Sequence, residues 1–141
     1  MVSDIIDAIS VALNKEFGDG YRIYSEEVPQ GTIEPYFFIK AVEPSQTQIR
    51  GPRYRRDTLF DIHFFPEQDY SYSEMHAVAE RLFFLLEFIP LLDGDLIHGT
   101  HMRYETVDGV LHFFVQYNMI IRRVEEKEQM EEMDVQTALK G

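Results

Sequence analysis

The sequence predicts an α+β domain in which two helices cover one face of a mostly antiparallel sheet. Three patterns indicate this class: two segments with apolar residues at helical spacing, several segments that alternate apolar and polar residues, and a two-residue hairpin signal late in the chain. The predicted order of elements is α-β-β-β-α-β-β. A chain of 141 residues is expected to form one domain, which we place at residues 1–124.

The first helix is predicted to begin at a Ser3 cap and to end at Gly18. Its apolar residues form one stripe: Val2, Ile6, Ile9, Leu13 and Phe17. Strands are then predicted at residues 21–28, 36–42 and 57–65. In the third strand, apolar residues alternate with Asp61 and His63, which are therefore expected on the polar face of the sheet.

A second helix is predicted from a Ser73 cap to Pro90, which closes it. Its core face carries residues at helical spacing: Met75, Val78, Ala79, Leu82, Leu86 and Ile89. Phe84 and Phe88 fall on the opposite side of this helix. The next turn is expected at 93–95, where the twelve-residue pattern of a calcium loop is missing.

The pair Asp108-Gly109 predicts a tight hairpin between the last two strands. In this register Val107 pairs with Val110. The next pairs, Thr106 with Leu111, Tyr104 with Phe113 and Met102 with Val115, share one face, so apolar partners lie together. The last strand is predicted to reach about residue 124. Residues 125–141 carry six acids and two lysines, and we expect a helical or frayed tail.

The composition excludes several functional classes. The formal net charge of −12 argues against a surface that grips DNA as a whole. The absence of cysteine excludes a disulfide scaffold and thiol catalysis. No apolar run approaches the ~20 residues of a membrane span, and the N-terminus does not resemble a signal peptide. We therefore expect a soluble intracellular protein with no membrane partner.

The histidines do not follow a known ligand spacing. His98 and His101 stand three residues apart at a predicted loop-to-strand junction, while His63 and His112 are expected on the polar faces of their strands. No phosphate-binding loop, nucleophile elbow or Cys-His pair is present. We expect no enzyme activity, no metal and no cofactor, and a metal-dependent hydrolase built from these four histidines is the weaker alternative.

Two sets of residues are typical of binding surfaces. The polar stretch at 43–56 is too long for a tight turn and holds four arginines, which suit an acidic partner or phosphates: Arg50, Arg53, Arg55 and Arg56. A solvated loop is the alternative. Four apolar residues exceed the needs of one core and predict a subunit interface, or a second layer of the same domain: Phe84, Phe88, Phe114 and Ile120.

Four segments together resemble the tail terminator family of tailed phages and prophages: YSEEVPQG at 24–31, EPYFFI at 34–39, the Arg55-Arg56 pair, and FDIHFFP at 60–66. The resemblance covers the chain up to the last strand. It implies a virion tail protein, assembled in the bacterial host cytoplasm, that forms a ring, usually a hexamer. That ring ends polymerisation of the tail tube and meets the head-tail connector, and double-stranded DNA only passes through it.

The resemblance implies no catalysis and no cofactor. It leaves open a neighbouring class, the head-tail neck or completion proteins of similar size. A nucleic-acid-binding module is a further alternative, in which the arginines of the 50–56 loop hold phosphates and Tyr54 stacks on bases. The predicted partner surface is the four-arginine loop, which would dock on the tube protein or on the adjacent subunit.

Overall fold

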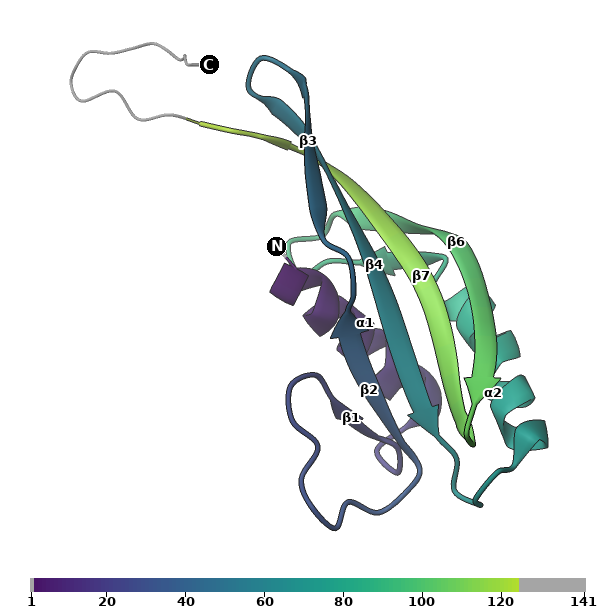
Figure 1. Ribbon diagram of the computed structural model, residues 1–141. Coiled ribbons are helices and arrows are strands. Elements are labelled where there is room, and N and C mark those ends of the chain that lie inside the picture. The colour runs from purple at the N-terminus through teal and green to yellow at the C-terminus, as the bar shows by residue number, and fades with distance from the viewer. Residues whose placement is uncertain (1, 125–141) are drawn as a thin grey trace.

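A computed structural model describes residues 2–124 and shows two helices packed on one side of a seven-stranded sheet (Figure 1). The α+β class is therefore confirmed. The helices are α1 (Val2–Phe17) and α2 (Tyr72–Leu85). The strands are β1 (Arg22–Tyr24), β2 (Tyr36–Ala41), β3 (Ser45–Arg50), β4 (Arg53–Phe65), β5 (Phe88–Pro90), β6 (Leu96–Val107) and β7 (Val110–Arg122). The predicted tail at 125–141 lies outside the described residues.

The sheet is mixed rather than simply antiparallel. Its strand order is β1-β2-β4-β7-β6-β5, and β3 pairs with β4 outside this path. β1 runs parallel to β2, whereas the other strand pairs of the described residues are antiparallel. The first predicted strand is correct in place but too long, because only three of its eight residues pair with β2.

The predicted element order is wrong at two points, because β3 and β5 were not expected. The stretch predicted as a polar loop at 43–56 is largely a β-hairpin, in which β3 pairs with the first part of β4. All six residues of β3 are exposed, so no apolar alternation marks it as a strand. It is held by backbone hydrogen bonds to β4, which have no sequence signature.

The second helix begins and ends earlier than the sequence predicts. The hydroxyl of Ser71, not that of Ser73, accepts a hydrogen bond from the backbone N–H of Glu74 at 3.3 Å. The helix ends at Leu85, and Phe88 lies on β5 rather than on the back of the helix. Leu86 and Ile89 lie beyond the end of the helix but are still buried in the core. The apolar periodicity therefore continues past Leu85 and does not mark the C-terminal end of α2.

The hairpin register between β6 and β7 is confirmed near the turn, where Val107 faces Val110 and Tyr104 faces Phe113. Both turn residues have the positive φ that this turn type requires, 51° at Asp108 and 78° at Gly109. At Met102 the ladder is interrupted by a β-bulge, in which His101 and Met102 both stand opposite Val115. The predicted pairing of Met102 with Val115 is therefore not a regular ladder pair, and the register shifts by one residue beyond the bulge.

The hydrophobic core lies between the helices and one face of the sheet. The buried aromatic side chains come from the three central strands: Phe37, Phe60, Phe64, Phe113 and Tyr117. The other face, called the outer face below, carries the alternate residues of the same strands. None of the helices among residues 2–124 is long and apolar enough to cross a membrane.

Candidate functional site

The arginines gather where the β3–β4 hairpin extends past the helices (Figure 1). Arg50 faces Arg53 across the hairpin, and Arg53 faces Arg122 of β7 in the ladder register. Arg55 follows two residues after Arg53 and points to the same outer face. Arg50, Arg53, Arg55 and Arg122 are all exposed, and we call them the arginine surface.

Arg50, Arg53 and Arg122 form one row across β3, β4 and β7. This row is unfavourable in isolation, because like charges that face each other directly repel. Within residues 2–124, Arg55 is the one member of this surface with an ion pair, in which its Nε donates to Asp57 Oδ1 at 2.8 Å. Arg56 points to the opposite face, where its Nε donates to the side-chain oxygen of Gln46 at 2.7 Å. The arrangement is therefore expected to favour an anionic partner over solvent.

The four apolar residues predicted as an interface lie on two different faces. Phe84 is 82% exposed on α2 and Phe88 is 50% exposed on β5. Phe88 also lines an apolar groove of about 240 Å³ between α1 and β5, together with Val11 and Leu85. On the outer face, Ile120 is exposed, whereas Phe114 is half-buried beneath the Arg103 guanidinium at 4.1 Å.

The outer face also holds a compact group of polar side chains in the middle of the sheet. His63 of β4 and His112 of β7 are direct partners in the ladder, and Asp61 precedes His63 by two residues on the same face. His63 Nε2 lies 3.0 Å and His112 Nδ1 lies 3.1 Å from Asp61 Oδ2. The two imidazole ring centroids are 4.4 Å apart. We call Asp61, His63 and His112 the Asp-His-His cluster.

Asp61 is only 9% exposed, although neither α1 nor α2 covers this face. Burial acts to raise the pKa of the Asp61 carboxyl, but hydrogen bonds from His63 and His112, and the charge of their rings, outweigh it and hold the pKa below its ordinary value. Asp61 Oδ1 is buried and has no hydrogen-bond partner among the described residues. Such an orphaned acceptor costs about 1–3 kcal/mol unless an ion or another group satisfies it.

The other predicted histidines do not join this cluster. His98 lies on β6 and stacks on the ring of Phe88 at 4.5 Å, and His101 sits at the β6 bulge beside Thr100. Both side chains are exposed at the surface of the domain. Sequence reasoning placed Asp61, His63 and His112 on polar strand faces but could not bring them together, because the pairing of β4 with β7 joins residues about fifty positions apart.

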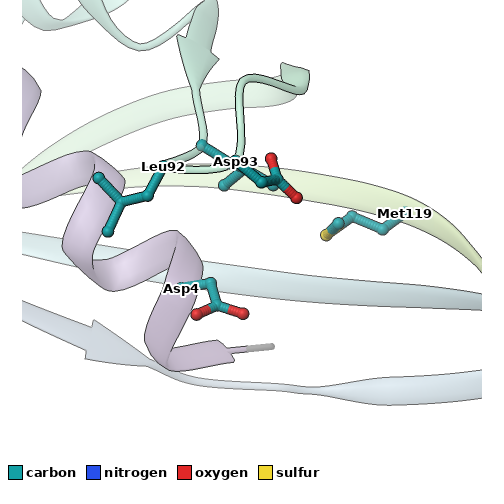
Figure 2. A pocket seen from close by; sticks show the side chains of 5 residues that line it. Asp4, Leu92, Asp93 and Met119 are labelled. Atoms are coloured by element: carbon teal, nitrogen blue, oxygen red, sulfur yellow. The ribbon is translucent and has the colours of Figure 1, made fainter.

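A second depression, of about 230 Å³, lies between α1 and the connection that leads from β5 to β6. Figure 2 shows Asp4 and Asp93 facing it, with Leu92 and Met119 along its border. The carboxylate of Asp93 stabilises its own turn, because Oδ1 accepts a hydrogen bond from the backbone N–H of Asp95 at 2.9 Å. The turn expected at 93–95 is therefore confirmed.

Comparison with known proteins gives one family. A family model described as phage tail terminator protein matches residues 4–130 of the chain. The match spans both helices and all strands of the structure, with the arginine surface, the apolar groove and the Asp-His-His cluster inside it. A search of curated proteins found no match.

Proposed function

Because the chain belongs to the phage tail terminator family, a family of structural tail proteins, we propose that its copies form a ring that caps the tail tube. The ring ends polymerisation of the tube and presents its free side to the head-tail connector. A ring of six subunits is the form that the family resemblance favours. The chain acts through surfaces and performs no chemical step in this role.

The observation that carries this proposal is the presence of two chemically different exposed surfaces on one small domain. Neighbouring subunits in a ring contact each other head to tail, so each subunit needs two complementary patches that differ from each other. The apolar groove beside Phe88, with the exposed ring of Phe84, supplies an apolar patch. The arginine surface supplies a cationic one, on the hairpin that extends past the helices.

We assign the arginine surface to the tube protein and the apolar groove to the adjacent subunit. The unfavourable row of Arg50, Arg53 and Arg122 is relieved when carboxylates of a partner face it, and guanidinium groups bind carboxylates in a bidentate manner. The groove buries apolar area without needing an opposite charge. The net charge of −12 is compatible with DNA that slides through the ring without being held.

The test is tube-length control in vitro. Purified tube protein is polymerised with the wild-type chain, with Arg50→Ala/Arg53→Ala, and with the matched control Arg22→Ala/Arg103→Ala. The control removes the same charge from exposed arginines elsewhere in the sheet. Electron microscopy should show capped, short tubes with wild type and control, and continued growth with the double variant.

Equal capping by the double variant would refute the arginine assignment. Failure of the wild-type chain to limit tube growth would refute the capping function itself. Retention on double-stranded DNA at low salt, lost steeply as salt rises, would favour a nucleic-acid role for the same arginines.

Native mass spectrometry of the full chain tests the ring. We expect a discrete hexamer whose population falls in Phe88→Ser, while Ile33→Ser keeps it, because Ile33 is an exposed apolar residue outside the groove. A hexamer insensitive to Phe88→Ser would move the subunit interface away from the groove.

A further inference from the structure

We propose that the Asp-His-His cluster binds one divalent transition-metal ion of the Zn²⁺ type. The site lies in the middle of the outer face, away from the arginine surface and from the apolar groove. The inference therefore does not depend on the proposed function.

The geometry is close to that of a metal site. One ligand atom from each of Asp61, His63 and His112 can be chosen so that all three lie within 4.8 Å of one another. Two of the separations are 3.0 Å and 3.1 Å. In a tetrahedral zinc site with bonds of about 2.0–2.2 Å, neighbouring ligand atoms lie roughly 3.3 Å apart. Small side-chain rotations therefore suffice to enclose an ion.

The sheet supplies this geometry by itself. Directly paired residues of antiparallel strands have side chains about 5 Å apart on one face, and a residue two positions away adds a third side chain to that face. His63 and His112 are such a pair, and Asp61 is the third residue. The backbone positions of all three residues are fixed by the ladder of the two central strands. Binding of the ion therefore costs little further conformational entropy.

The donor set selects the class of ion. Two imidazole nitrogens and one carboxylate oxygen suit Zn²⁺ and its neighbours in the first transition row. Calcium and magnesium prefer sites made of oxygen ligands, so they are poor occupants. Three protein ligands leave at least one coordination position for water or for a group from another molecule.

The competing explanation is a cluster held by hydrogen bonds alone, without a metal ion. The environment of the second carboxylate oxygen of Asp61 distinguishes the metal site from this alternative. Asp61 Oδ2 accepts both imidazole hydrogen bonds, while Oδ1 is buried without a hydrogen-bond partner among residues 2–124. A bound cation neutralises the whole carboxylate, Oδ1 included. Phe38 and Phe114 are the register partners of His63 and Asp61, and their apolar rings flank the cluster. These rings limit the access of water molecules that would otherwise donate a hydrogen bond to Asp61 Oδ1.

The experiment measures zinc binding by the full chain after chelation and removal of the chelator. Isothermal titration with ZnCl₂ should give one ion per chain with a dissociation constant in the micromolar range or tighter. His63→Gln and His112→Gln should each weaken binding by about 100-fold or more, since losing a ligand costs at least as much as losing one of its supporting groups. His98→Gln is the matched control and should bind zinc like wild type.

Zinc should also raise the melting temperature of wild type and of His98→Gln but not of His112→Gln. CoCl₂ should give the visible absorption of a low-coordinate cobalt site in wild type and in His98→Gln, but not in His63→Gln or His112→Gln. The absence of stoichiometric zinc binding by wild type overturns the proposal, and so does unchanged affinity in the folded His63→Gln and His112→Gln variants. If circular dichroism shows either variant unfolded, Asp61→Asn replaces it under the same criteria.

Discussion

Tyr117 on β7 links the sheet to the end of α2, and the hydroxyl of this residue offers a quantitative test of the structure. Its side chain is fully buried, and its hydroxyl donates a 2.7 Å hydrogen bond to the backbone oxygen of Leu86, the residue that caps α2. Tyr117→Phe keeps the ring and removes only the hydroxyl. The net loss is about 0.5–1.5 kcal/mol for the hydrogen bond, rising to about 3 kcal/mol if the Leu86 oxygen stays dry.

The same substitution changes how stability depends on pH. Burial raises the pKa of the Tyr117 phenol well above its ordinary value of 10. The unfolded chain therefore loses this proton first as pH rises, and stability is fully present below about pH 10 and falls above it by up to about 1.4 kcal/mol per pH unit. Tyr117→Phe lacks this contribution. The stability difference between wild type and variant should therefore shrink as pH rises above about 10.

Urea denaturation measured from about pH 7 to about pH 11 tests both parts. Tyr72→Phe is the control, because Tyr72 is 46% exposed and loses the same hydroxyl. At neutral pH Tyr117→Phe should be less stable than this control by about 1–2 kcal/mol. If the two variants were equally stable, or if wild type and Tyr117→Phe had the same slope above pH 10, the described burial of Tyr117 would be wrong.

Three further substitutions test the fold and the exposed surface. Gly99→Ala would place a Cβ 2.5 Å from the carbonyl oxygen of Leu86, so we expect a loss of about 1–3 kcal/mol in thermal denaturation. Gly20→Ala, which has open space around the new Cβ, should cost less than half as much. Ser71→Ala should lose about 1 kcal/mol in urea denaturation because Ser71 is the helix cap, and a larger loss in Ser73→Ala would contradict this cap. Phe84→Ser should change the free energy of unfolding by no more than about 0.5 kcal/mol, since the Phe84 ring is 82% exposed. A larger loss would show that this ring is packed against the rest of the domain in the free subunit.

The sequence predicts best the elements whose signal is local. The apolar stripe of α1, the alternation in β2 and the Asp108-Gly109 turn each lie within a few neighbouring residues, and all three elements are found as expected. Even here the prediction is limited to ideal geometry. The bulge in β6 shifts the register because His101 adopts a positive φ of 52°, which a period-two pattern cannot encode.

Several features missed by sequence reasoning depend on the pairing between strands. β3 is a strand because β4 supplies its hydrogen-bond partners, and its exposed residues show no alternation. Arg122 joins the arginine surface only through the pairing of β7 with β4. The same pairing brings His112 to His63, so Arg53 and His63 each acquire a partner that no spacing along the chain reveals.

The burial of Asp61 on an uncovered face follows from the same alternation that builds the core. In the segment FDIHFFP, one set of residues packs under the helices, and the other set places Asp61, His63 and Phe65 on the outer face. Phe65 stacks on Tyr36 of β2 at 4.3 Å, and Phe38 meets His63 edge-on at 5.6 Å, so aromatic rings form a partial second layer there. A carboxylate set among these rings has low exposure although α1 and α2 lie on the other face. This segment, which contributes to the family resemblance, therefore also builds the Asp-His-His cluster, and loss of that cluster need not disturb the arginine surface at the far end of β4.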